Sequence, residues 1–238
     1  MAQQMTSQTL RIIGLALTYP TSGLLEAAGE MQGLLECEGW LPPALRRDVS
    51  ALLDDLAGQD LLDAQEAYVD LFDRTPSLSL HLFEHVHGDS RERGQALVDL
   101  DTLYRERGLE NRSEHTPDYL PMFLEYLALL PVEEARSMLV GAIEVIGAIG
   151  ARLKKRQSRY ACLFDALEAA AACKPDPARL QSALAADAGE IPDNEALDAA
   201  WQEQFALAAL DQGEAGCPKV EDMLARMQDK LPEAGVRS

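Results

Sequence analysis

The side chains best suited to chemistry gather in one short segment, residues 68–100. Its sequence, YVDLFDRTPSLSLHLFEHVHGDSRERGQALVDL, holds three of the four histidines of the chain, His81, His85 and His87, beside Glu84. Imidazole and carboxylate groups are ligands for zinc and similar ions, and His81 and His85 would share one face of a helix because they lie four residues apart. One hypothesis is therefore a metal-dependent enzyme that uses these four side chains.

The other interpretation is that these histidines are hydrogen bonded beside a groove. Their spacing matches no recognised metal site, and a further ligand would have to come from elsewhere in the chain. We therefore favour hydrogen-bonded histidines and expect no bound metal.

Catalytic motifs are missing from the sequence. There is no GxSxG elbow and no glycine-rich phosphate loop. The four cysteines, Cys37, Cys162, Cys173 and Cys217, are scattered without a CxxC pair, as is typical of free thiols in a reducing compartment. The sequence predicts a protein that is not an enzyme and holds no resident cofactor.

Charge and hydropathy restrict the partners further. The 238 residues include 21 Lys and Arg against 40 Asp and Glu, a net charge of −19. This balance argues against nucleic acid and anionic lipid surfaces; it suits a basic partner, or simply solubility. No secretory signal and no apolar run of about 18 residues are present, so we expect a cytoplasmic protein without stable membrane association.

The apolar pattern is helical throughout, and β-branched residues are sparse. We expect an all-α, single-domain bundle of eight to ten helices over residues 1–212, followed by a thinly apolar tail, 213–238, typical of partial disorder. Gly141, Gly147 and Gly150 should let a neighbouring helix approach closely. The expected helices span residues 7–18, 22–38, 44–58, 60–72, 91–107, 117–130, 132–156, 158–173, 178–188 and 193–210, with Pro117 in the first turn of the sixth.

Three stretches together resemble one known family. Residues 68–100, PDYLPMFLEYLALLP at 117–131 and RLKKRQSRYACLFDAL at 152–167 are similar to the nitrate reductase branch of the TorD/DmsD/NarJ family of redox-enzyme maturation chaperones. The resemblance implies a TorD-like fold and a chaperone, expected to be monomeric, that binds the apo catalytic α subunit of respiratory nitrate reductase through its basic, partly apolar N-terminal peptide. It also implies support for molybdenum cofactor insertion before membrane docking, with molybdenum cofactor delivery proteins as further partners.

The resemblance also implies a set of peptide-binding residues. The expected groove lies between the helix ending at Phe72, the histidine connector (residues 79–87) and the helix begun by Pro117. In this sequence Tyr119 stands where the family usually has a histidine, which removes a group that titrates near neutral pH. The implied residues are Tyr68, Leu71, Phe72, Glu84, His85, His87, Arg93, Pro117, Asp118, Tyr119 and Leu120.

Overall fold

The computed structural model describes residues 8–87, 91–111 and 114–186, which form ten α-helices and no strand. The all-α prediction is thereby confirmed. None of these helices has the length and apolar content needed to cross a membrane. In chain order they are α1 (Gln8–Ala16), α2 (Ser22–Glu38), α3 (Pro43–Gly58), α4 (Leu61–Tyr68), α5 (Glu84–His87), α6 (Arg91–Glu106), α7 (Leu120–Leu127), α8 (Val132–Lys155), α9 (Ala161–Ala171) and α10 (Pro177–Ala186).

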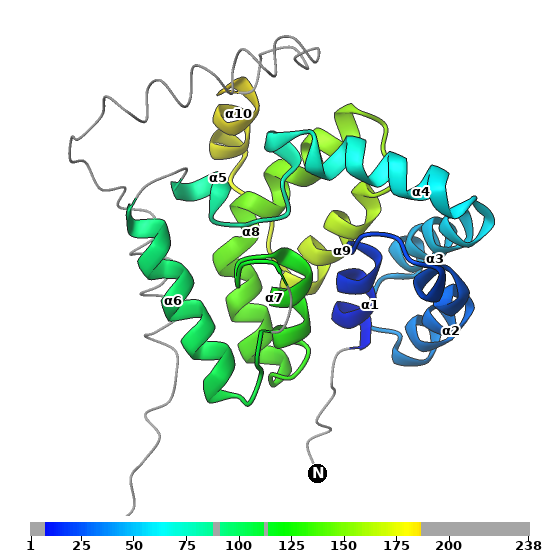
Figure 1. The fold of residues 1–238 in the computed structure, drawn as a ribbon, viewed down its shortest axis with the longest axis horizontal. Helices are drawn as coiled ribbons and strands as arrows, with labels where there is room; N and C mark the ends of the chain where they lie inside the picture. Colours follow the sequence, from blue (N-terminus) through cyan, green and yellow to red (C-terminus); the bar gives the residue numbers. More distant parts are fainter. Residues whose placement is uncertain (1–7, 88–90, 112–113, 187–238) are drawn as a thin grey trace, which may run out of the picture.

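The longest helix, α8, packs against α7, α9 and α10, whereas α2 packs against α1 and α3 (Figure 1). The α2–α3 pair lies at one side of the molecule and α6 at the other, with α7 and α8 between them. Gly150 of α8 meets α9 so closely that a Cβ atom there would lie 2.9 Å from Cβ of Phe164, and a Cβ at Gly147 would overlap the ring of Pro175. The predicted close approach of a helix is confirmed at Gly150, whereas at Gly147 the close neighbour is Pro175, in the segment between α9 and α10.

The short helix α1 is clamped between α2 and α7. A Cβ at Gly14 would lie 3.2 Å from the carbonyl oxygen of Pro121 in α7. The Glu38 carboxylate, at the end of α2, accepts main-chain N–H bonds from Gln8 at 3.1 Å and Thr9 at 2.6 Å. The first N–H groups of a helix lack partners inside the helix, and the Glu38 carboxylate accepts two of them. Its negative charge also interacts favourably with the positive end of the α1 helix dipole.

Local signals set most other helix ends. The Thr21 hydroxyl caps α2 by accepting from the Leu24 N–H, and Asp60 caps α4 by accepting from the Leu62 N–H at 2.9 Å. Gly108, just beyond α6, has a φ of 79°, the left-handed conformation that glycine adopts without strain.

Three expected boundaries differ from the structure by three residues or more. Pro117 lies in a turn, and α7 begins at Leu120 with Pro121 in its first turn, so the expected helix start is wrong by three residues. The helix expected to continue to residue 72 changes at Val69 into a π-helix, Val69–Asp73. The helix expected from residue 158 begins at 161. The helix expected at 193–210 and the division at residue 213 lie outside the described residues.

Candidate functional site

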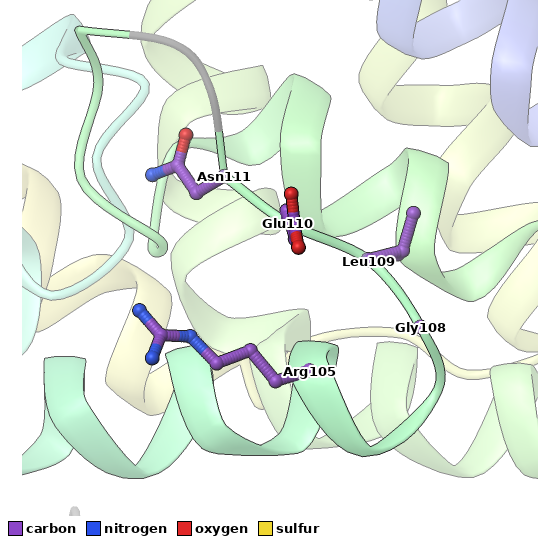
Figure 2. A pocket seen from close by; sticks show the side chains of 5 residues that line it. All are labelled: Arg105, Gly108, Leu109, Glu110 and Asn111. Carbon is purple, nitrogen blue, oxygen red and sulfur yellow. The ribbon is translucent and has the colours of Figure 1, made fainter.

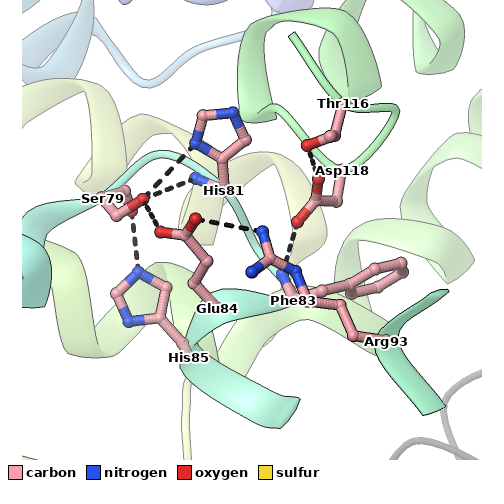
Figure 3. Close-up of polar contacts among 8 residues, drawn as sticks. All are labelled: Ser79, His81, Phe83, Glu84, His85, Arg93, Thr116 and Asp118. Carbon is pink, nitrogen blue, oxygen red and sulfur yellow. Dashed lines mark hydrogen bonds and ion pairs between the residues drawn. The ribbon is translucent and has the colours of Figure 1, made fainter. Parts of the chain in front are cut away.

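Ser79 is the centre of the histidine connector (Figure 3). Its hydroxyl donates to the Glu84 carboxylate and accepts from the main-chain N–H of His81 at 3.2 Å. The same oxygen lies 3.5 Å from Nδ1 of His81, and the Ser79 carbonyl oxygen lies 2.7 Å from Nε2 of His85. Ser79 therefore forms hydrogen bonds with His81, His85 and Glu84. This arrangement is the one expected if the histidines of the connector are hydrogen bonded and hold no metal.

Arg93 of α6 completes this cluster. Its guanidinium donates to the second Glu84 carboxylate oxygen at 3.0 Å. Partial burial opposes ionisation of Glu84, but the Ser79 hydrogen bond and the positive charges of His81 and Arg93 outweigh it and lower the pKa of the carboxyl. The connector and α6 are thus held together by a half-buried ion pair.

The metal hypothesis finds no support among the described side chains. No group of three or more His, Cys, Asp or Glu side chains within residues 8–87, 91–111 and 114–186 is arranged to hold a metal ion. The side chain of His87, the fourth member of the proposed cluster, lies outside the described residues.

Asp118 joins the connector to the start of α7. Its side chain is fully buried, and Oδ2 accepts the main-chain N–H of Phe83 at 3.0 Å while Oδ1 accepts the Thr116 hydroxyl at 2.5 Å. The Asp118 carbonyl oxygen accepts the Leu82 N–H at 3.0 Å. Residues 80–83 and 116–120 are therefore held side by side by an aspartate buried between them.

Tyr119 extends this contact to α1. Its hydroxyl lies 3.1 Å from the hydroxyl of Tyr68, which donates to the carbonyl oxygen of Leu17 at 2.9 Å. Burial raises the pKa of both phenols, so both stay protonated and able to donate. The Tyr119 ring stacks on His115 with 3.9 Å between ring centroids. Tyr119 therefore links α4, α1 and the loop before α7.

Five of the eleven residues implied by the resemblance are interior. Tyr68, Phe72, Asp118, Tyr119 and Leu120 are all less than 9% exposed. Leu71 packs partly buried against the core, His85, Arg93 and Pro117 are half-buried, and Glu84 is exposed.

The open groove lies beside these residues rather than among them. At the expected position, between the end of α4, the connector and α7, the ring of Phe72 packs on Tyr68 at 5.0 Å and on Tyr160 at 5.2 Å. Tyr119 lies between these rings and the open groove, whose wall it lines. Peptide binding by the implied residues stays a prediction.

This groove, the α1 groove, has a volume of about 670 Å³ and runs along α1 between α2 and α7. Three large apolar side chains are exposed in it: Leu15 at 50%, Tyr19 at 45% and Leu34 at 37%. Apolar side chains this exposed, side by side, are typical of an interaction surface. The lining residues are Gln8, Arg11, Ile12, Gly14, Leu15, Thr18, Tyr19, Thr21, Ala27, Glu30, Met31, Leu34, His115, Tyr119, Pro121, Met122 and Glu125.

The rim of the α1 groove is charged. Exposed carboxylates stand on opposite sides, Glu30 on α2 and Glu125 on α7, and Arg11 lies on α1. Partial burial and the neighbouring His81 lower the pKa of His115, so this imidazole is mainly neutral at pH 7. The lining therefore presents an apolar floor with more acidic than basic groups.

Sequence reasoning missed the α1 groove, although a signal was present. The apolar residues of α1 and of the turn after it fall into two sets: Leu10, Ile13 and Leu17 are fully buried, whereas Leu15 and Tyr19 are exposed. A surface helix normally has one apolar stripe. The second set was the available sign of a partner.

A second cavity, of about 510 Å³, lies at the end of α6 (Figure 2). Leu109 is the only large apolar side chain among the residues that line it, and Arg105 is paired with Asp101 at 2.8 Å. None of the implied site residues borders it. The lining residues are Arg105, Gly108, Leu109, Glu110 and Asn111.

Known proteins are similar to this chain over most of its length. Residues 39–166 match the family described as nitrate reductase delta subunit. The nitrate reductase molybdenum cofactor assembly chaperone NarJ of Escherichia coli K12 is 41% identical over 204 residues, 86% of each chain. The probable chaperone NarW of the same organism is 38% identical over 203 residues, 83% of this chain and 82% of its own. The probable chaperone NarJ of Bacillus subtilis is 34% identical over 105 residues, 44% of this chain and 57% of its own.

Proposed function

The chain belongs to the nitrate reductase delta subunit family, and on this premise we propose that it is an assembly chaperone for a respiratory nitrate reductase. It binds the catalytic α subunit in its apo form through that subunit's N-terminal peptide. It thereby supports insertion of the molybdenum cofactor and delays docking at the membrane. The family and its relatives are chaperones of cofactor assembly and not enzymes, which supports the absence of a catalytic role.

The α1 groove is the observation that carries this proposal. Its lining follows three helices, at 8, 11, 12, 14 and 15 on α1 with 18 and 19 just beyond its end, at 27, 30, 31 and 34 on α2, and at 119, 122 and 125 before and along α7. A helix laid over α1 would contact all three at once. From Gln8 to Leu15 the helical part of the floor is about 10 Å long, which suits about two turns of an amphipathic helix.

Charge supports a basic ligand. Glu30 and Glu125 flank the apolar floor, and the whole chain carries a net charge of −19. Opposite charge steers a basic peptide toward the groove and raises its association rate more than its final affinity. An apolar peptide with basic residues along its edges therefore matches both the floor and the rim.

Buried residues implied by the family resemblance hold the wall of the α1 groove in place. Asp118 and Tyr68 fix Tyr119, which is part of the groove wall. We propose that the buried members act by this positioning. The accessible members, Glu84, His85, Arg93 and Pro117, together with His87, would contact parts of the α subunit beyond the groove.

Calorimetric titration with the N-terminal peptide of the cognate α subunit tests the proposal. Leu15→Asp should weaken binding at least about tenfold, because it places a charge on the apolar floor. Leu62→Asp is the matched control: Leu62 is 73% exposed on α4 and does not line the groove, so affinity should not change. If the peptide does not bind, or if both variants bind it like the wild type, the groove is not the client site.

The rim charges give a second, independent readout. Glu125→Lys should mainly slow association, by about three- to tenfold at low salt, and the difference should shrink as salt is added. The control is Glu66→Lys, an exposed glutamate of α4 outside the groove. Equal salt dependence for both variants would exclude electrostatic steering by the rim.

Location and assembly state form part of the same proposal. We propose a cytoplasmic monomer that contacts molybdenum cofactor delivery proteins while the α subunit is bound. Light scattering of the purified protein should give the mass of one chain, 26.0 kDa. Affinity purification from nitrate-grown cells should recover the α subunit, and its absence would contradict the chaperone role.

A further inference from the structure

One positively charged side chain lies in the α1 groove: Arg11, on the exposed side of α1. In the described part of the chain it is the only lysine or arginine that lines this groove. His115 also borders the groove, but its imidazole is mainly neutral at pH 7 because its pKa is lowered. Arg11 is therefore the one permanent cation beside the two rim carboxylates, Glu30 and Glu125.

The Arg11 guanidinium forms no ion pair with any carboxylate of residues 8–87, 91–111 and 114–186, not even with Glu30 or Glu125 in the same groove. Carboxylates are plentiful, because the chain has 40 acidic residues and 21 basic ones. Other arginines of the described segments do find such partners. Those paired with an aspartate or a glutamate are Arg46, Arg74, Arg93, Arg105, Arg107, Arg136 and Arg159.

The stability of α1 does not explain an arginine at this position. Arg11 is the fourth residue of the helix, so its charge lies near the positive end of the helix dipole, where cations are unfavourable. The carboxylate at that end, Glu38, is already bound to the N–H groups of Gln8 and Thr9. A negative group on a ligand would supply the partner that the fold leaves out.

Arg11 is placed where a bound helix must cover it. Arg11 and Leu15 lie four residues apart on the exposed side of α1, about 6 Å along its axis. A ligand helix that packs on Leu15 and continues along the floor therefore also reaches Arg11. Covering the guanidinium removes part of its hydration, which is unfavourable without a new acceptor. A carboxylate at this point restores the lost hydrogen bonds, and it can accept two of them from the planar guanidinium.

We propose that Arg11 is a specificity-determining residue of the α1 groove, and that it pairs with a carboxylate of the client peptide. This inference rests on the proposed function, because it takes the groove as the client site. The carboxylate lies one helical turn, three or four residues, from the apolar side chain that packs on Leu15. The preferred ligand is thus an amphipathic helix with basic residues at its edges and one aspartate or glutamate beside its apolar face.

Arg11 also acts against wrong ligands. The acidic rim formed by Glu30 and Glu125 attracts any basic amphipathic helix. A helix that has only basic groups beside its apolar face brings like charge to Arg11 and covers the guanidinium without an acceptor. The rim therefore selects for overall positive charge, and Arg11 selects for one negative charge at a fixed place.

Arg11→Gln tests the pairing, because general attraction and a specific ion pair predict opposite results. If the groove only attracts positive charge, the loss of a cation should tighten binding of the basic α-subunit peptide. The ion pair instead predicts binding that is about three- to tenfold weaker, mainly through faster dissociation. Arg11→Lys keeps the charge but not the planar fork, so its affinity should lie between the two. Arg47→Gln is the matched control, since Arg47 is an exposed arginine of α3 outside the groove, and it should bind like the wild type.

A second peptide completes a double-mutant cycle. It is the same α-subunit sequence with every aspartate and glutamate replaced by its amide, and both peptides carry an amidated C-terminus. Wild-type protein should bind the second peptide about three- to tenfold more weakly than the first, whereas Arg11→Gln should bind the two equally. Unchanged or tighter binding by Arg11→Gln, or the same preference in both proteins, overturns the pairing.

The Leu15→Asp variant separates this failure from failure of the proposed function. If Leu15→Asp weakens binding and Arg11→Gln does not, the groove is the client site and the ion pair is wrong. If the wild type does not bind the peptide, or if neither variant changes its affinity, both the client groove and the ion pair are refuted. Weaker binding in both variants, together with the equal affinity of Arg11→Gln for the two peptides, supports both.

Discussion

Replacing Asp118 by alanine should destabilise the protein, because the main-chain N–H of Phe83 in the connector loses its hydrogen-bond acceptor. The lost carboxylate accepts the Phe83 N–H at 3.0 Å and the Thr116 hydroxyl at 2.5 Å, and Phe83 is only 1% exposed. Hydrogen bonds to a charged group contribute about 1.5–3 kcal/mol each, and an unsatisfied buried N–H costs about 1–3 kcal/mol. The substitution also removes the cost of burying the carboxylate, so we expect a net loss of about 2–4 kcal/mol.

Asp118→Asn separates geometry from charge. Asparagine can accept the Phe83 N–H with its oxygen and donate to the Thr116 hydroxyl with its nitrogen, so both contacts survive as neutral hydrogen bonds. Because neutral bonds are weaker, we expect a loss of about 1–2 kcal/mol. Asp70→Ala is the surface control: its partner Arg74 is 64% exposed, and such pairs contribute less than about 1 kcal/mol.

Urea unfolding followed by far-ultraviolet circular dichroism measures all three variants. The expected order of stability is Asp70→Ala, then Asp118→Asn, then Asp118→Ala, with similar urea dependence for each. If Asp118→Ala lies within about 0.5 kcal/mol of wild type, the buried carboxylate does not hold the connector. If asparagine is as destabilising as alanine, charge rather than geometry is what matters.

Three further substitutions test other contacts. Tyr119→Phe should cost about 0.5–1.5 kcal/mol, since it removes the hydroxyl contact with Tyr68, which keeps its bond to a main-chain carbonyl. Gly150→Ala should cost about 1–3 kcal/mol, because the new Cβ would lie 2.9 Å from Phe164. Glu84→Gln should destabilise the protein at pH 7, and its difference from wild type should shrink as the pH falls below 4.5, the ordinary pKa of the carboxyl.

The sign of the last effect follows from the lowered pKa. A carboxyl whose pKa is lower in the folded state stabilises that state above its unfolded pKa and loses the contribution as the pH falls through the folded value. A difference that grows on acidification would contradict the assignment. For the glycine, Gly29→Ala is the control, because nothing lies within 4 Å of the added Cβ and no loss is expected. For Tyr119→Phe, unchanged stability would show that the hydroxyl pair contributes nothing.

Local signals in the sequence were enough for most of the helices. Asp60 caps the start of one helix and Gly108 follows the end of another, as predicted, because caps and breakers act on the residues beside them. The start of α7 could not be predicted in this way. Asp118 resembles a helix-start residue, but its carboxylate serves Phe83, 35 positions away, and no local pattern encodes that contact.

The α1 groove could not be predicted from the sequence for a different reason. Periodicity shows that α1 is apolar on two faces, but it cannot say which face the rest of the chain covers. Only the positions of α2 and α7 leave Leu15 and Tyr19 exposed. Ser79 escaped notice likewise, because a serine in a loop gives no sign that it will bind two histidines and a glutamate.

Tyr119 connects the buried residues Asp118 and Tyr68 to the wall of the exposed α1 groove. The connector is fixed to residues 116–120 by Asp118, and the next side chain, Tyr119, reaches α1 through Tyr68 and borders the groove. A histidine at this position would be shorter and could keep the ring contact with His115 but not the reach of the phenol hydroxyl. Substitutions in the connector should therefore change peptide affinity without touching the peptide, by moving the groove wall.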